Sequence, residues 1–525
     1  MRAQTPWPRS GWTGRSSVSW RCVQRATRGD KVSNVRSDVS SLLCPTVDCG
    51  LVDPDAGWEL SGEEVVQRVD GLAAQITAAG VVPGDAVALV LDHGPGAVLA
   101  FLAVLRCNAT AIPLNPQLHS HEMEALLGSR TPALVVLGQE TGSQGAQAAN
   151  ELRVPAVTLV ADRDPQLQHA PPGHIDRLPD PDAEAVALLL HTSGTTGRPK
   201  AVPLRQRNLT ASAREIARGY GLCADDVSYC LMPLFHVHGL VASTLAALGA
   251  GGAVVVPRRI RPSAVWQHGR AHGVTWFSAV PTILAKLPPR PQTEGDRLRF
   301  VRSCSSALAP SLWTALEERL GVPIVEAYGM TEASHQMTTN PLPPRERRPG
   351  TVGTPAGADV RILDADWEVV PAGTAGEVAV HGPGVVDGYL DNDEANAVSF
   401  RDGWFRTGDL GRLSPDGYLS LEGRLKELIN RGGEKIAPRE IDEALLAHPA
   451  VLEAVAFGRP DPKWGEVVEA VVVLGTPVTS DALREHCRER LAVFKVPRTV
   501  HIVEQIPKGA TGKIQRRMVA DTLGT

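Results

Sequence analysis

The hydrophobic positions of the chain alternate between helical and strand spacing from residue 63 to residue 138. A helix is predicted from Val65 to Ile76, where apolar residues repeat every three or four positions, and Gly80 can end it. Further helices are predicted at about 97–107 and at 121–127, and apolar strands at 86–91, 109–113 and 133–137. This order indicates parallel strands with helices on both faces. The alternation resumes from 185 to 327, whereas the polar, proline-containing stretch 139–183 is predicted to be a loop-rich connection.

Short strands separated by Gly, Pro and Asp turns follow from about 350 to 422 and predict a small β subdomain. After Gly423, helices are predicted at 439–447 and 480–491, and strands at 451–457, 467–474 and near 498–503. The predicted fold class is therefore α/β. A large N-terminal domain at 45–423 combines two α/β subdomains with the β subdomain, and a hinge at 424–427 connects it to a small α+β domain at 428–525.

The composition is that of an ordinary soluble globular protein. A chain of 525 residues is too long for one core, and 43% hydrophobic and 21% charged residues are unremarkable. A net charge of −5 gives no general attraction to nucleic acid or membranes, and the apolar run 97–105 is too short to span a bilayer. The eight cysteines show no C-x-x-C pair, so neither a zinc site nor a disulfide framework is indicated. This pattern suits a reducing cytoplasm.

The first 36 residues differ from the rest, with eight Lys or Arg, one acidic residue and three tryptophans. The composition is similar to that of a transit peptide, but no apolar core of a secretory signal follows. We expect residues 1–44 to be a basic, disordered extension. An arm that binds nucleic acid or membrane, and a start codon assigned too far upstream, are the alternatives.

A loop rich in hydroxyl and glycine residues follows the strand predicted at 185–190, and it reads TSGTTGRPK from Thr192 to Lys200. Gly194 and Gly197 allow successive backbone N–H groups to converge on one anion. The side chains that can donate to phosphate are Ser193, Thr195, Thr196 and Lys200. The spacing differs from that of P-loop NTPases, and Pro199 and Pro203 argue against a following helix. A plain surface turn is the alternative.

The segment Tyr328-Gly329-Met-Thr331-Glu332 supplies the complementary groups for a nucleotide. A carboxylate such as Glu332 suits Mg²⁺, which prefers oxygen ligands. Thr331 can reach the α-phosphate, and Tyr328 offers a flat face to a base. The small residues Ser306 and Ala307, in a segment that precedes a helix predicted at Pro310, would let a purine lie against backbone. Capping of a short helix is the alternative role for Glu332.

Together these motifs, in this order from about residue 45 to the C-terminus, resemble the AMP-forming acyl-CoA synthetases of the adenylate-forming superfamily. The resemblance implies ATP, Mg²⁺ and coenzyme A as cofactors and co-substrates, with Glu332 as the metal ligand. It implies that Asp409 in TGD binds the ribose, with Arg424 beside it, and that Lys426 is the hinge residue of a small, mobile domain. Lys513 matches the catalytic lysine, and Gly432 and Gly433 match a loop that lines the pantetheine tunnel.

In this family, the acid first attacks the α-phosphorus of ATP and releases pyrophosphate, and the thiol of coenzyme A then displaces AMP. The residues around the acid site resemble those of the subgroup that ligates oxalate. The polar residues His236, His238, Ser305 and His335 would suit a second carboxylate, because burying one without partners is costly. A fatty acid is the alternative substrate. An adenylating enzyme that loads a separate carrier protein and a nucleotide-binding regulator are the alternative functions. The expected partners are small molecules, and the oligomeric state and the resting domain orientation stay open.

Overall fold

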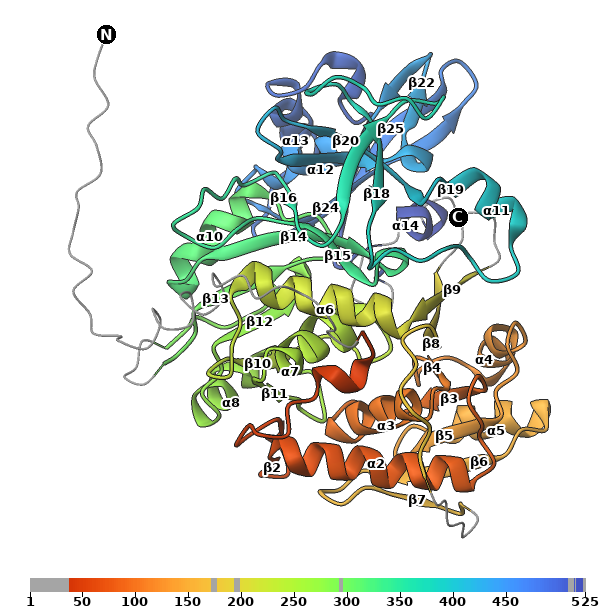
Figure 1. Cartoon of the computed structure of the whole chain (residues 1–525). Coiled ribbons are helices and arrows are strands. Elements are labelled where there is room, and N and C mark those ends of the chain that lie inside the picture. The colour runs from red at the N-terminus through yellow and green to blue at the C-terminus, as the bar shows by residue number, and fades with distance from the viewer. Residues whose placement is uncertain are drawn as a thin grey trace.

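The computed structural model describes residues 37–170, 177–192, 199–291, 296–508, 514 and 516–522, and it arranges their strands in four sheets (Figure 1). The first sheet has seven strands. Its spatial order is β7 (Gln166–Gln168), β6 (Ala156–Val160), β5 (Leu134–Gly138), β3 (Ala86–Val90), β4 (Thr110–Pro113), β8 (Val186–Thr192) and β9 (Lys200–Arg205). The strands from β6 to β8 pair in parallel, and β7 and β9 are antiparallel edges. Pro203 is tolerated because β9 is an edge strand.

Four helices accompany this sheet, namely α2 (Gly62–Ala78), α3 (Pro95–Arg106), α4 (Ser120–Leu127) and α5 (Ser143–Leu152). The predictions for the first three are confirmed within a few residues, and α2 begins with a capping box in which Ser61 and Glu64 exchange hydrogen bonds. The prediction of a loop-rich connection at 139–183 was wrong. That stretch contains α5, β6 and β7, and α5 packs through Ala148 and Ala149, which are small residues that leave only a weak hydrophobic pattern.

The second sheet has nine strands. Its spatial order is β16 (Thr354–Pro355), β15 (His335–Thr339), β14 (Ile324–Met330), β13 (Phe300–Ser303), β12 (Trp276–Ala279), β10 (Val227–Cys230), β11 (Ala253–Val255), β1 (Leu51–Asp53) and β2 (Trp58–Leu60). The strands from β14 to β1 are parallel, as expected. The helical segments of this part are η1 (Val39–Leu42), α6 (Gln206–Tyr220), the π-helix η2 (His238–Leu245), α7 (Ala246–Gly249), η3 (Pro262–Ala264), α8 (Val265–Ala271), α9 (Pro281–Ala285), α10 (Pro310–Leu320) and η4 (Thr331–Ala333).

The predicted β subdomain is confirmed as a five-stranded sheet. It contains β17 (Asp359–Leu363), β18 (Gly376–His381), β20 (Trp404–Leu413), β19 (Phe400–Arg401) and β21 (Leu419–Arg424), all paired antiparallel, with α11 (Asp393–Ser399) between β18 and β19. Tyr389 from this region belongs to the largest hydrophobic core, which also includes residues of both α/β subdomains. The β subdomain is therefore packed as part of the N-terminal domain.

The C-terminal unit has a sheet of its own. Its strands are β23 (Glu434–Ile436), β22 (Ile429–Arg431), β25 (Gly465–Leu474), β24 (Val451–Asp461) and β26 (Thr499–Val503), and its helical segments are η5 (Leu425–Glu427), α12 (Pro438–Leu446), α13 (Ser480–Arg488), η6 (Val493–Lys495) and α14 (Arg516–Thr522). Ile441, Val468 and Leu483 contribute to a hydrophobic core that contains residues of this unit alone. None of the helices in the described ranges is long and apolar enough to cross a membrane.

Candidate active site

The motifs that the sequence singled out follow the carboxyl ends of parallel strands. Tyr328 and Gly329 lie on the last residues of β14, Ser306 and Ala307 follow β13, and Thr192 is the last residue of β8. β13 and β14 belong to the nine-stranded sheet and β8 to the seven-stranded sheet, and ligands of α/β proteins bind beyond the carboxyl ends of such strands. Ser193, Gly194, Thr195, Thr196, Gly197 and Lys513 lie outside the described residues.

Asp409 and Arg424 form the first polar group of the site. They face each other in register on β20 and β21, and Arg424 Nε lies 2.7 Å from Asp409 Oδ1. The hydroxyl of Tyr328 donates to Asp409 Oδ2, so residues far apart in the sequence meet at one carboxylate. Burial raises the pKa of Asp409, and the charge of Arg424 opposes this effect. An anchored carboxylate of this kind can accept hydrogen bonds from a diol.

Glu332 and Lys200 form the second group. Glu332 lies in the single turn η4, whose N-cap is Met330, so the capping alternative for Glu332 is not realised. Burial raises the pKa of Glu332, and the hydroxyl of Tyr389 donates to its Oε1 at 3.0 Å. Lys200 Nζ lies 4.3 Å from the centroid of the same tyrosine ring. Burial and then the charge of Lys426 lower the pKa of Lys200, while Glu332 opposes them.

The chemistry of this group fits a divalent cation that arrives with a nucleotide. Within the described ranges, no set of three His, Cys, Asp or Glu side chains could hold a metal ion by protein ligands alone. Mg²⁺ is commonly held by one or two carboxylates, with the remaining ligands supplied by phosphates and water. Glu332, a buried carboxylate on the turn that follows β14, meets this requirement.

A buried polar cluster lies beside these groups. His238 Nδ1 lies 3.0 Å from Ser305 Oγ, and its Nε2 lies 2.6 Å from Ser278 Oγ. The rings of His238 and His335 lie 4.9 Å apart between centroids. Three of the four residues predicted to contact the acid are therefore in one place. His236 lies on the loop before η2, where its ring centroid is 4.8 Å from that of Phe235.

Arg302 is the charged residue of this cluster, and sequence reasoning did not assign it to the site. It is 0% exposed and donates to the hydroxyls of Tyr220 and Ser278, each at 3.0 Å. It also donates to His335 Nδ1 at 3.3 Å and to Gln336 Oε1 at 3.2 Å. Its electrostatic partners are Cys304 and Tyr220, and among the described residues no Asp or Glu forms an ion pair with it. The available signal was an arginine in the centre of the apolar strand β13, where a charge is costly unless it has a function.

The direction of the hydrogen bonds follows from the chemistry of arginine, which donates and never accepts. Arg302 donates to Ser278 Oγ, which leaves the Ser278 hydroxyl proton free to donate to His238 Nε2; in that tautomer His238 Nδ1–H donates to Ser305. Because Arg302 donates to His335 Nδ1, the proton of His335 lies on Nε2. The cluster therefore offers the Ser305 hydroxyl and the His335 Nε2–H as donors, with a full positive charge behind them.

The remaining predicted residues lie on loops around these groups. Ser306 and Ala307 are exposed in the loop after β13, and Leu308 N–H fixes the end of that loop on Glu326 Oε1 at 2.9 Å. Lys426 lies in η5, directly after Arg424 and Leu425. Gly432 and Gly433 connect β22 to β23 with φ values of 61° and 97°, a turn that favours glycine. A Cβ on Gly432 would lie 2.9 Å from Trp464 Cε3, so the turn is also tightly packed.

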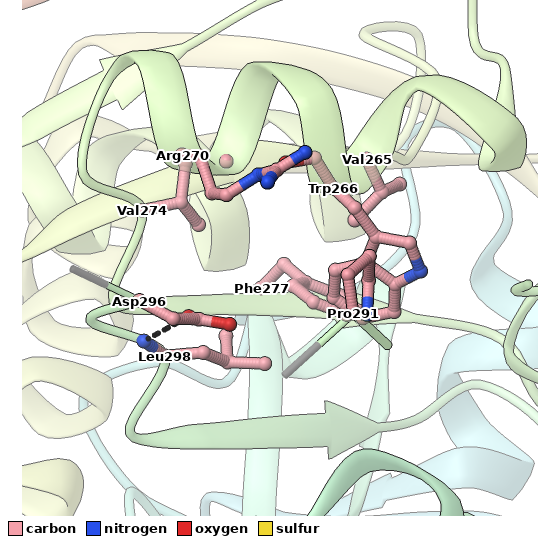
Figure 2. Close-up of a pocket in the computed structure, with 9 residues that line it drawn as sticks. Val265, Trp266, Arg270, Val274, Phe277, Pro291, Asp296 and Leu298 are labelled. Atoms are coloured by element: carbon pink, nitrogen blue, oxygen red, sulfur yellow. Dashed lines mark hydrogen bonds between the residues drawn. The ribbon is translucent and has the colours of Figure 1, made fainter. Parts of the chain in front are cut away.

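Two cavities differ in their suitability for a ligand. One, of about 210 Å³, is lined mainly by apolar residues, including Leu89, Phe101, Pro233 and Phe235, and so adjoins the loop that carries His236. The other, lined by residues such as Trp266, Phe277 and Asp296, has about 10 Å³ (Figure 2). That volume admits about one water molecule, so the second cavity is not a substrate site.

The fold and these groups define a two-domain α/β enzyme that binds a nucleotide at strand ends. Residues 47–390 match the family model of the AMP-binding enzymes, and residues 440–513 match that of the AMP-binding enzyme C-terminal domain. The chain belongs to the AMP-binding enzyme family. Its reaction is the AMP-forming ligation of a carboxylic acid to coenzyme A, with ATP as co-substrate.

Known relatives and solved structures agree with this assignment. The chain is 46% identical to an oxalate–CoA ligase of Arabidopsis thaliana over 463 residues, which are 85% of this chain and 90% of the relative. It is 50% identical to an oxalate–CoA ligase of Saccharomyces cerevisiae over 342 residues, which are 64% of this chain and 63% of the relative. The crystal structure of ATP-bound MatB from Rhodopseudomonas palustris superposes on this chain with a TM-score of 0.84 and a sequence identity of 29%. The superposition covers 93% of this chain and 99% of the MatB chain.

Proposed function

We propose that the enzyme ligates a small dicarboxylic acid, with oxalate favoured, to coenzyme A. The observation that carries this proposal is the buried Arg302 guanidinium, whose hydrogen-bond partners among the described residues are all neutral side chains. A buried charge without a counter-ion is costly, and a substrate that brings its own negative charge repays that cost. The similarity to the two oxalate–CoA ligases supports the same substrate.

The second carboxylate of the acid would bind at Ser305 and His335. Both would present donors to it, because Arg302 donates to His335 Nδ1 and Ser278 can donate to His238 Nε2. A fatty acid would place methylene groups against these donors and leave them without partners, at a cost of about 1–3 kcal/mol for each. The polar cluster therefore favours the dicarboxylate over the fatty acid.

Formation of the acyl adenylate needs charge neutralisation and alignment rather than a general base, because the substrate carboxylate is already ionised at neutral pH. We assign the ribose to Asp409, with Arg424 beside it, and the adenine to the surface formed by Tyr328, Gly329, Ser306 and Ala307. The loop from Thr192 to Lys200 would bind the phosphates. Thr331 would contact the α-phosphate, and Lys513 would bridge it to the attacking carboxylate. Mg²⁺ held by Glu332 would neutralise phosphate charge when bound.

Thioester formation would use a different part of the C-terminal domain from the one that carries Lys513. The thiolate of coenzyme A attacks the acyl carbonyl, the bond to the phosphate oxygen breaks, and AMP leaves. We place the hinge at 424–427, so that Lys426 lies between a domain at 45–423 and a domain at 428–525. The separate hydrophobic core of the C-terminal unit supports this division. The turn at Gly432 and Gly433 would then line the path of the pantetheine arm. A cytoplasmic location stays a prediction from the cysteine pattern.

The test is the release of AMP from ATP, with coenzyme A present, against acids of increasing length. The panel contains oxalate, malonate, glycolate, acetate, octanoate and palmitate. We expect oxalate to have the highest kcat/KM and palmitate to be inactive. Turnover that rises with chain length would refute the dicarboxylate assignment. Adenylate formation without transfer to coenzyme A would instead favour a separate carrier protein as acceptor.

A further inference from the structure

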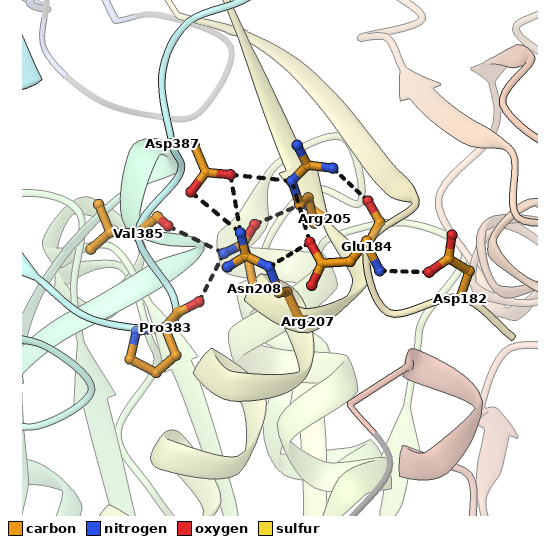
Figure 3. A network of polar contacts seen from close by, with 8 residues as sticks. All are labelled: Asp182, Glu184, Arg205, Arg207, Asn208, Pro383, Val385 and Asp387. Carbon is orange, nitrogen blue, oxygen red and sulfur yellow. Dashed lines mark hydrogen bonds and ion pairs between the residues drawn. The ribbon is translucent and has the colours of Figure 1, made fainter. Parts of the chain in front are cut away.

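The segment 383–390 connects β18 to α11, and polar contacts hold it against the end of β9 and the start of α6 (Figure 3). Asp387 pairs with Arg205 at 3.2 Å and with Arg207 at 3.0 Å. Asn208 Nδ2 donates to the carbonyls of Pro383 at 2.8 Å and Val385 at 3.2 Å. The backbone of the segment is thus fixed just before Tyr389.

Tyr389 itself is held by its own backbone and by its ring. Its N–H donates to Asn396 Oδ1 at 2.7 Å, and Asn396 Nδ2 donates to its carbonyl at 2.9 Å. The ring packs edge-on against Phe400, at 5.5 Å between centroids, and against Phe405, at 6.4 Å. Leu390 N–H donates to the carbonyl of Ala201 at 2.9 Å, which ties the residue after Tyr389 to the residue after Lys200.

The ring held in this way lies between two opposite charges. Its hydroxyl donates to Glu332 Oε1 at 3.0 Å, and its face lies 4.3 Å from Lys200 Nζ. In the part of the chain that the structure describes, Lys200 and Glu332 do not form an ion pair with each other. They are close enough to interact, because the charge of Glu332 raises the pKa of Lys200 and the charge of Lys200 lowers the pKa of Glu332. The ammonium finds a partner in the aromatic face, and the carboxylate finds one in the hydroxyl.

We propose that Tyr389 is a positioning residue that keeps Lys200 and Glu332 apart, so that the carboxylate stays available to a divalent cation. The proposal rests on the proposed function, in which Glu332 binds Mg²⁺ and Lys200 binds phosphate. Without the ring, the two side chains would collapse into a partly buried ion pair. That pair would withdraw the carboxylate from the cation and the ammonium from the nucleotide together.

The experiment measures ATP binding to the full-length protein by calorimetry, once with Mg²⁺ and once with EDTA. The quantity of interest is the magnesium ratio, the Kd in EDTA divided by the Kd in Mg²⁺. We expect Y389L to lower this ratio about tenfold, the effect of one ion pair of about 1.4 kcal/mol. Y389F keeps the ring and should retain most of the ratio. The matched control is Y418L, because the half-buried Tyr418 also stacks on a cation, Arg348, and its hydroxyl donates to the carbonyl of Glu346 rather than to Glu332.

A double variant separates positioning from a general structural effect. In Y389L/K200M the competing ammonium is absent, so the magnesium ratio should return toward that of K200M alone. An unchanged ratio in Y389L, or no recovery in the double variant, would overturn the proposal. If Y389L is unfolded at the assay temperature, Y389Q gives the same test, since it keeps a donor but removes the ring. A wild-type protein whose ATP affinity does not depend on Mg²⁺ would instead refute the metal role of Glu332 in the proposed function.

Discussion

Replacement of Arg302 by methionine tests the charge behind the acid site. Methionine keeps an unbranched apolar stem about as long as the aliphatic part of arginine and removes the guanidinium with its charge and its hydrogen bonds. The charge acts on the second carboxylate across the 3.3 Å bond to His335, the imidazole ring and one more hydrogen bond. At a separation of about 8 Å and an effective dielectric constant of about 20, one unit charge contributes about 2 kcal/mol. We therefore expect R302M to lower kcat/KM for oxalate by about 30-fold.

The assay compares oxalate with glycolate, which has one carboxylate and nearly the same size. AMP release is measured with each acid, and the result is the ratio of the two kcat/KM values. R302M should lower that ratio, and R302K, which keeps the charge, should retain most of it. The matched control is R218M on the surface of α6, where Arg218 is 75% exposed and pairs with Glu215. A ratio that stays at the wild-type value in R302M, with the melting temperature preserved, would refute the role assigned to Arg302.

Three further predictions concern the nucleotide site, the catalytic lysine and the buried carboxyl of Glu326. D409N removes the charge that Arg424 and Tyr328 anchor, so the KM for ATP should rise about 10- to 100-fold while the KM for oxalate changes little. Initial rates measure both constants, and a raised KM for oxalate with an unchanged KM for ATP would contradict the ribose role. K513A should abolish ATP–pyrophosphate exchange while ATP binding by calorimetry stays nearly intact, and wild-type exchange in this variant would refute the assignment. Burial raises the pKa of Glu326 to about 7 from 4.5, so the native protein retains a proton that the unfolded chain releases between these pH values. Stability should therefore fall by about 3 kcal/mol as the pH rises through that window. E326Q should remove this loss, and its melting temperature should exceed that of the wild type at pH 8 but not at pH 4.5; equal melting temperatures at pH 8 would show that Glu326 is ionised without cost.

The hydrophobic pattern predicted most helices and strands of the first α/β subdomain and of the small domain, and the α/β alternation of the second subdomain, because long apolar runs report burial directly. It failed at 139–183, where α5 packs through alanines and the sequence looks polar. Gly432 and Gly433 were expected from the family resemblance to line the pantetheine tunnel, and the structure shows only that they form the turn between β22 and β23, with positive φ values. The family was also readable from the sequence, since its motifs are short, contiguous and in order.

By itself, the sequence determined the reaction class of this protein, its two-domain plan and the residue types at the nucleotide site. Only the tertiary structure decided which groups act on each other. Ser278 and Tyr220 carried no motif, yet both contact Arg302, because the register of β12 and β13 sets Ser278 opposite Arg302 and α6 ends beside them. Tyr389 contacts Glu332 for a similar reason, although 57 residues separate them. Local sequence encodes backbone preference and burial, whereas contacts between distant segments depend on how the sheets pair and pack, which no short pattern contains.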